Sequence, residues 1–243
     1  MDSQPKILEW LQRRDVQSRL AMAVTLSLSS AFPVALLALR SRITDSIGFR
    51  FLLWNLFLAW IPFGFALLAE WGWRRHWTRG QILWPLFGWL LFFPNAPYLV
   101  TDLIHLRPND SAPLWFDALI LMSMGLAGLL VGFVSLRMVQ LIINASFGRP
   151  WGWTVSIGVL GLSGVGIYLG RFARYNSWDI LSRPRSLLYD VQSMAFDPIS
   201  NQRAIAVSLL FALFLIVFYL ATVALGQLHL PTRRDPPDSV DLR

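Results

Sequence analysis

Two polar segments of the chain hold most of the side chains that could do chemistry. The first covers residues 92–117 and the second covers residues 168–179, and both follow long apolar stretches. If those stretches span a membrane, an ionisable side chain beside them is costly, so each one is a candidate for function. The candidate binding residues in the two segments are Asn95, Asp102, His105, Asp117, Arg171, Arg174, Asn176 and Asp179.

Three residues of the first segment form a carboxylate–imidazole–carboxylate set. Asp102 and His105 are three positions apart and would share one face of a helix, and Asp117 follows at the start of the next apolar stretch. Such a set could bind a divalent metal ion, or it could act as a general base whose imidazole is tuned by a carboxylate. The alternative is structural, with Thr101 or Asp102 capping a helix after Pro97 and His105 exposed at the interface.

The second segment contributes a pair of arginines, Arg171 and Arg174, which are also three positions apart. Paired guanidinium groups can hold a phosphate or a carboxylate through two hydrogen bonds each. They could equally form ion pairs with Asp102, Asp117 or Asp179 and neutralise buried charge within the protein. The sequence leaves both alternatives open.

Asn95 lies in a stretch that is expected to break a helix, because Pro94 and Pro97 flank it. Transporters place substrate sites at such breaks, where unwound backbone lines a cavity. A simple helix end is the alternative. No phosphate-binding glycine loop, nucleophile elbow or zinc-protease motif is present, and we predict no cofactor.

Three strings carry a resemblance to a known family. They are FFPNAPYLVTDLIHL at residues 92–106, WFD at residues 115–117 and YLGRFARYNSWD at residues 168–179. With them, the chain resembles a family of bacterial multi-pass membrane proteins, domain of unknown function 1361, over roughly residues 50–220. The resemblance implies a membrane location and a helical bundle, and it implies no activity or catalytic residue.

The composition excludes an ordinary soluble domain. Hydrophobic residues make up 55% of the chain and charged residues only 14%, against roughly 25% charged in an average soluble domain. The net charge of +7 comes from basic residues clustered between apolar stretches, which indicates topology signals and contact with anionic lipid rather than nucleic acid. The absence of cysteine excludes disulfides, thiolate metal sites and cysteine nucleophiles.

The apolar stretches predict an all-α fold, a polytopic transmembrane bundle of about six spans. The predicted spans are residues 20–39, 49–70, a third from residue 81 that is short or broken at its prolines, 114–136, 152–170 and 204–226. One domain would cover residues 20–228, after an amphipathic charged segment at 1–19 that lies on the membrane surface. Residues 229–243 are predicted to be a disordered, basic, proline-containing tail, and residues 186–196 a short interfacial helix.

The order of the spans places both polar segments on one side of the membrane, because two crossings separate the end of span three from the end of span five. The segments expected inside carry more Lys and Arg if both termini are cytoplasmic. We therefore predict a multi-pass protein of the cell (inner or plasma) membrane with both termini inside, and the polar segments at the extracytoplasmic interface.

These observations predict one polar cluster of Asp102, His105, Asp117, Arg171 and Arg174. It would bind a cation, a proton or a lipid headgroup, and the charge count slightly favours a cation or proton. Alternatives are an accessory or assembly subunit with a purely structural cluster, a small-molecule transporter, or a membrane-embedded lipid-processing enzyme. The expected partners are membrane lipids and a protein partner in the membrane, and the sequence predicts no oligomeric state.

Overall fold

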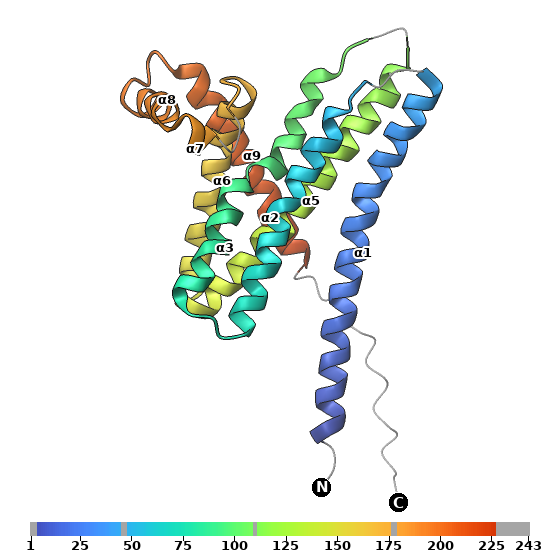
Figure 1. Cartoon of the computed structure of the whole chain (residues 1–243), viewed down its shortest axis with the longest axis vertical. Helices are drawn as coiled ribbons and strands as arrows, with labels where there is room; N and C mark the ends of the chain where they lie inside the picture. Colours follow the sequence, from blue (N-terminus) through green and yellow to red (C-terminus); the bar gives the residue numbers. More distant parts are fainter. Residues whose placement is uncertain (1–3, 45–47, 109–110, 176–178, 227–243) are drawn as a thin grey trace, which may run out of the picture.

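The computed structural model describes residues 4–44, 48–108, 111–175 and 179–226, and every regular element in these ranges is a helix (Figure 1). This confirms the predicted all-α class. The elements are α1 (Gln4–Thr44), α2 (Phe51–Arg74), α3 (Arg79–Phe92), α4 (Asn95–Tyr98), the 3₁₀ helix η1 (Leu99–His105), α5 (Leu114–Phe147), α6 (Arg149–Arg171), α7 (Asp179–Ser182), α8 (Pro184–Phe196) and α9 (Gln202–Gly226).

Six helical segments are long and apolar enough to cross a membrane, as predicted. They are Arg19–Thr44, Phe51–Arg74, Arg79–His105, Leu114–Phe147, Arg149–Arg171 and Gln202–Gly226. Each exceeds the ~20 residues that a helix needs to cross the hydrocarbon layer. The chain is therefore an integral membrane protein, and its outward apolar side chains have lipid as their solvent.

Helices α1 and α5 extend well beyond the predicted spans. Helix α1 runs without interruption from Gln4, so the predicted surface segment at 1–19 continues directly into the first span. Helix α5 extends to Phe147, past Arg137, which was predicted to begin a loop and instead donates a hydrogen bond to Gln140 Oε1 at 2.6 Å within the helix. The predicted tail at 229–243 lies outside the described residues.

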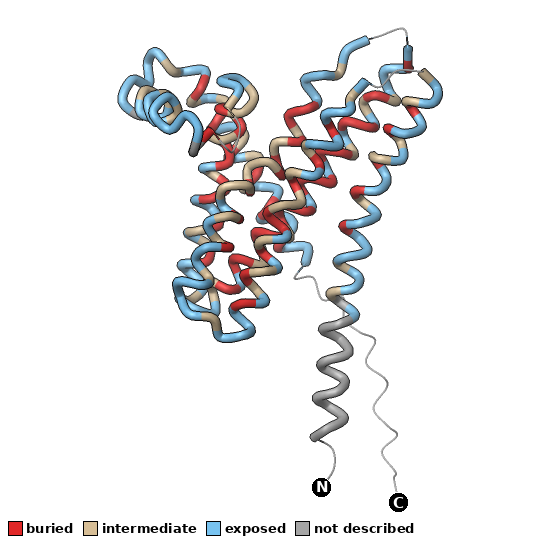
Figure 2. The backbone as a smooth tube through the Cα atoms, in the orientation of Figure 1, coloured by how far each residue is buried: buried red, intermediate tan, exposed pale blue. Residues whose placement is uncertain are grey.

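Helix α5 is the central element of the bundle. It packs against α1, α2, α4, η1 and α6, while α9 packs against α6 and α3 against α2. Figure 2 shows buried positions concentrated along α5 and α2, whereas most of the α1 positions whose burial is described are exposed. The predicted interfacial segment is helical in α8, which lies at the end of the bundle where α6 ends and α9 begins (Figure 1).

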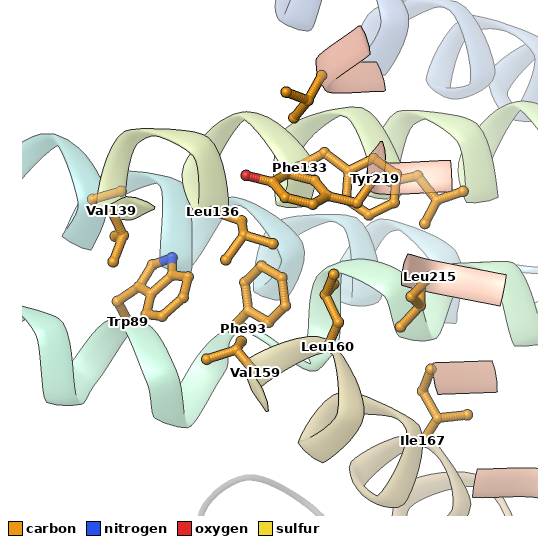
Figure 3. Close-up of a cluster of buried hydrophobic side chains, with 13 residues drawn as sticks. Trp89, Phe93, Phe133, Leu136, Val139, Val159, Leu160, Ile167, Leu215 and Tyr219 are labelled. Carbon is orange, nitrogen blue, oxygen red and sulfur yellow. The ribbon is translucent and has the colours of Figure 1, made fainter. Parts of the chain in front are cut away.

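The largest apolar cluster fills the space between α3, α5, α6 and α9 (Figure 3). Its aromatic members also make polar contacts inside the bundle. Trp89 donates a hydrogen bond to Ser135 Oγ at 3.2 Å, and the Tyr219 hydroxyl donates to Gln140 Oε1 at 2.8 Å. These bonds satisfy polar groups that would be costly to bury alone.

The third span is broken where the prolines predict it. Pro97 has no N–H for the usual helical bond to the carbonyl of Phe93, and that carbonyl instead accepts from the Ala96 N–H at 3.1 Å. The Asn95 side chain donates to the Phe92 carbonyl at 2.9 Å. The chain then continues as α4 and the tighter helix η1.

Glycines let α5 approach this irregular segment closely. A Cβ added to Gly128 would lie 2.5 Å from the carbonyl oxygen of Ala96. Gly164 has the same role where α6 packs against α9, because a Cβ at this position would overlap the Ser208 carbonyl oxygen. Small residues at such crossings are a common feature of packed membrane helices.

Two ion pairs mark the two ends of the apolar layer. Arg19 of α1 pairs with Glu70 near the end of α2, and Arg40 of α1 pairs with Asp117 at the start of α5. About 20 residues separate Arg19 from Arg40, which corresponds to about 30 Å of helix. That length matches a hydrocarbon layer of about 30 Å, and no charged residue lies between the two arginines.

Candidate functional site

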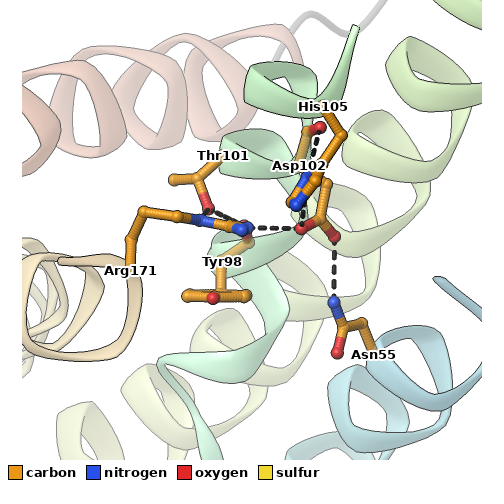
Figure 4. Close-up of polar contacts among 6 residues, drawn as sticks. All are labelled: Asn55, Tyr98, Thr101, Asp102, His105 and Arg171. Carbon is orange, nitrogen blue, oxygen red and sulfur yellow. Dashed lines mark hydrogen bonds and ion pairs between the residues drawn. The ribbon is translucent and has the colours of Figure 1, made fainter. Parts of the chain in front are cut away.

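Asp102 is the centre of a buried polar network at the end of the third span (Figure 4). One carboxylate oxygen, Oδ1, accepts a hydrogen bond from Nη2 of Arg171, and the two side chains form an ion pair. The other oxygen, Oδ2, accepts from Nδ2 of Asn55 at 3.0 Å. Both oxygens therefore have a protein donor, as a fully buried carboxylate requires.

Arg171, the last residue of α6, is held by three further contacts. Its Nε and Nη2 donate to Thr101 Oγ1 at 3.0 and 2.8 Å, and its guanidinium carbon lies 4.4 Å from the centre of the Tyr98 ring. Thr101 in turn donates to the Tyr98 carbonyl at 2.6 Å. The network connects α2, α4, η1 and α6, and it brings Asp102 of the first polar segment into contact with Arg171 of the second.

His105 lies at the edge of this network. Its Nδ1 is 3.2 Å from the Asp102 carbonyl oxygen and 3.9 Å from Asp102 Oδ1, and its ring centre is 4.8 Å from that of Phe51. The 3₁₀ geometry of η1, with three residues per turn, places positions 102 and 105 directly above one another. The His105 side chain is 40% exposed.

Asp117 forms a separate ion pair with a residue that sequence analysis treated as a topology signal. Arg40 Nε and Nη2 donate to the two Asp117 oxygens at 2.6 and 3.1 Å, and both side chains are buried. Arg40 follows buried Pro33 and Leu37 at helical spacing, so it lies on the face of α1 that packs against α5. That spacing accounts for the face of α1 that Arg40 occupies, but it does not identify Asp117 as its partner.

The predicted metal set of Asp102, His105 and Asp117 is not assembled. Within the described residues, no three His, Asp or Glu side chains lie close enough together to hold a metal ion. Asp102 and Asp117 each have an arginine partner instead. These pairs neutralise the charge that a cation would otherwise balance.

A cavity of about 410 Å³ opens beside the network, between α2, the broken third span, the end of α6 and α8. Asn55 and Tyr98 belong to both the network and the cavity wall. The lining residues are Trp54, Asn55, Leu58, Leu91, Pro94, Asn95, Tyr98, Gly166, Leu169, Gly170, Arg174, Tyr175 and Leu187. Part of the wall is thus apolar, and the rest presents amides, phenols and one guanidinium.

Arg174 is the only charged residue of the described lining. It is exposed, and it makes no hydrogen bond or ion pair with any other described residue. Its backbone is left-handed, with φ of 60°, and the following N–H, of Tyr175, donates back to the Leu169 carbonyl at 3.0 Å. A left-handed non-glycine residue costs on the order of 1–3 kcal/mol, and such strain is concentrated at functional sites.

Tyr175, a residue of the cavity wall, forms a hydrogen bond with α8. The Tyr175 hydroxyl donates to Asp190 Oδ2 at 3.0 Å, and Leu187 of the same helix lines the cavity. Partial burial and the hydrogen bond to the Asp190 carboxylate raise the pKa of Tyr175 above its ordinary value. The phenol therefore stays protonated and can donate at neutral pH.

Asp179 lies outside the Asp102 network. Asp179 is buried in α7, where its Oδ1 accepts from Ser182 at 2.8 Å and lies 3.9 Å from Arg183 Nε. Asn176 lies outside the described residues. Sequence analysis missed Asn55 and Tyr175, although Asn55 is the only amide or charged residue between Phe51 and Ala69, which is a signal of function within a span.

Comparison with known proteins places the chain in a family. Residues 54–218 match the model described as Protein of unknown function (DUF1361), which covers more than half of the chain. The chain belongs to this family. The DUF1361 match contains both polar segments and every cavity residue, so the resemblance carried by the three strings is confirmed. No curated protein and no solved structure gives a match.

Proposed function

We propose that this DUF1361 protein binds the anionic headgroup of a membrane lipid in the cavity beside Asn55, Tyr98 and Arg174. The observation that carries the proposal is Arg174, a cation on the cavity wall with no acidic partner among the described residues. None of the described lining residues is acidic. A phosphate in the cavity would be the complementary charge, and arginine holds phosphate through two parallel hydrogen bonds.

The apolar part of the wall favours a lipid over a soluble anion. Trp54, Leu58 and Leu91 line the cavity, and the Trp54 side chain is 55% exposed on the outer face of α2. Tryptophan is enriched at the headgroup level of membranes. A lipid could therefore place its headgroup at Arg174 and leave its chains along the outer face of the bundle.

The Asp102–Arg171 pair has a supporting role in this proposal. Both Asp102 oxygens are used inside the protein, which argues against cation or proton binding at this carboxylate. The pair instead fixes Asn55 and Tyr98 on the cavity wall. This differs from the predicted cluster, in which all five charged and imidazole side chains would act together.

The alternative functions fit the geometry less well. A lipid-processing enzyme of the predicted type needs His105 and a carboxylate in the cavity, and neither lines its described wall. A purely structural subunit should have every charge paired and no cavity. A transporter remains the second candidate, because the broken third span contributes Pro94, Asn95 and Tyr98 to the cavity.

We place the cavity at the extracytoplasmic interface of the cell membrane. The ends of spans three and five lie on the same side in a six-span chain. The excess of Lys and Arg in the opposite segments supports cytoplasmic termini.

The proposal is tested by lipid binding to Arg174→Gln, measured by native mass spectrometry of protein released from nanodiscs. Loss of a charged hydrogen bond should weaken binding of phosphatidylglycerol about tenfold and leave binding of phosphatidylcholine nearly unchanged. Arg185→Gln is the matched control, since it removes the same charge from an exposed position of α8 that does not line the cavity. Equal loss in both variants would show general electrostatic attraction and refute the site.

A further inference from the structure

We infer that the headgroup bound in the cavity is a phosphopolyol, meaning a phosphate that carries a hydroxyl-rich group such as inositol or a sugar. This inference rests on the proposed function and narrows its ligand. It is carried by hydrogen-bonding groups of two cavity-lining residues, Asn55 and Tyr98, that the Asp102 network leaves unused.

The orientation of the Asn55 amide is fixed by its neighbour. An ionised carboxylate can only accept hydrogen bonds, so the Asn55 group that faces Asp102 Oδ2 at 3.0 Å must be the amide nitrogen. The amide oxygen then points away from Asp102, as Figure 4 shows. It makes no hydrogen bond with another described residue. The cavity wall therefore carries an acceptor that cannot rotate into a donor.

A carbonyl acceptor does not suit a bare phosphate, whose oxygens are themselves acceptors. It requires a ligand that brings a donor, either a hydroxyl or an ammonium. An ammonium is disfavoured, because Arg174 would repel it and no acidic residue of the described lining would attract it. Hydroxyl groups beside a phosphate satisfy both Asn55 and Arg174.

Tyr98 adds a second group suited to hydroxyls. The Arg171 guanidinium lies 4.4 Å from its ring centre and restricts the ring, while its hydroxyl makes no hydrogen bond with another described residue. A phenol both donates and accepts, as a polyol hydroxyl does. The volume of about 410 Å³ is at the lower end of the range for small-ligand sites, roughly 300–1,000 Å³. It suits a headgroup and excludes the acyl chains.

The test compares two lipids with the same single negative charge and the same acyl chains. Phosphatidylinositol carries a polyol and phosphatidylethanol carries none, and each is titrated in nanodiscs of phosphatidylcholine. The intact chain should bind phosphatidylinositol about threefold to tenfold more tightly, the effect of one or two hydrogen bonds. Tyr98→Phe keeps the ring under Arg171 and the Asn55 acceptor, and should lower this ratio without abolishing it, because it removes the hydroxyl alone. Tyr189→Phe, an exposed tyrosine of α8, is the control and should leave the ratio unchanged.

The outcomes separate this inference from the proposed function. If the two anionic lipids bind equally and Arg174→Gln weakens both, the polyol inference fails and headgroup binding stands. If Arg174→Gln weakens neither, the proposed function fails as well. Tighter binding of phosphatidylethanolamine than of phosphatidylinositol would overturn the inference in favour of an ammonium ligand. Displacement of lipid by soluble inositol phosphate would support the polyol chemistry and overturn the lipid as its source.

Discussion

At the scale of residues, two arginine–aspartate pairs replace the single cluster expected from the sequence. Asp102 pairs with Arg171 and Asp117 pairs with Arg40, and all four side chains have little or no exposure. An unpaired charge at either position would be left in a site without water to solvate it. Each aspartate therefore depends on its own arginine for a stable fold, and the two dependences can be measured separately.

Asp102→Ala should destabilise the protein by about 3–5 kcal/mol, because it leaves buried Arg171 without its partner. Arg171→Met in the same chain should restore part of that loss, whereas Arg40→Met should not. Asp117→Ala should show the opposite preference, with rescue by Arg40→Met alone. Thermal unfolding in detergent measures each combination, and rescue by either arginine change alike would mean that the two pairs form one cluster.

The sequence predicts that Asp102 and Arg171 meet, but it does not predict the pair of Asp117 with Arg40. The parity of the spans brings residue 102 and residue 171 to the same side, and the cost of unpaired charge predicts that they meet. The sequence does not predict the role of Arg40. An arginine at the end of a span looks the same in the sequence whether it contacts lipid headgroups or faces α5. The lone amide Asn55 marks a polar position within the second span, but nothing in the sequence identifies Asp102 as its partner across the bundle.

At the scale of elements, the broken third span depends on the absence of a side chain on α5. A methyl group at Gly128 would lie 2.5 Å from the Ala96 carbonyl oxygen, a backbone atom that cannot move aside. The break itself is predictable, because Pro94 and Pro97 remove two helical donors. The 3₁₀ form of η1 is not, since it follows from packing against α5 rather than from local propensity.

Gly128→Ala should therefore destabilise the bundle by about 1–3 kcal/mol, the usual effect of overpacking. Gly158→Ala is the matched control, because a Cβ at that helical position has no atom within 4 Å. It should be neutral or slightly stabilising, since alanine favours a helix more than glycine does. The two variants are compared by thermal unfolding in the same detergent, and equal losses would refute the close contact.

The attachment of α8 should depend on pH through Tyr175. Its raised pKa means that the hydrogen bond to Asp190 is fully present below the ordinary tyrosine pKa of 10.0 and is lost as pH rises through the higher folded value. The chain has no cysteine, so a spin label at Tyr189→Cys reports on α8 alone. Its mobility should rise only above about pH 10. In Tyr175→Phe the label should be mobile at every pH, and a persistent transition there would assign it to another group.

At the scale of the whole molecule, the charges of two helices define the position of the bundle in the membrane. Arg19 and Arg40 on α1, and Asp117 and Arg137 on α5, are each about 20 residues apart with no charge between them, or about 30 Å of helix. The cavity lies toward the Arg40–Asp117 end, where the third span ends. The sequence predicts six spans and this spacing well, because lipid imposes length and apolarity on each helix separately.

Which end faces outward is decided by labelling single cysteines in intact cells with a maleimide that cannot cross the membrane. Gly80→Cys lies at the start of α3 with open space around its Cβ, and Ser200→Cys lies in the exposed turn before α9. In a six-span bundle the first residues of α3 and α9 lie on opposite sides of the membrane, so one label must react and the other must not. Cytoplasmic termini predict reaction at position 200 and protection at position 80 until the membrane is permeabilised.

The reverse result would invert the bundle and place the cavity on the cytoplasmic side, where the headgroup would come from the inner leaflet. The same result at both positions, reaction or protection, would mean that the third span does not cross. The parity that brings Asp102 to Arg171 would then be lost.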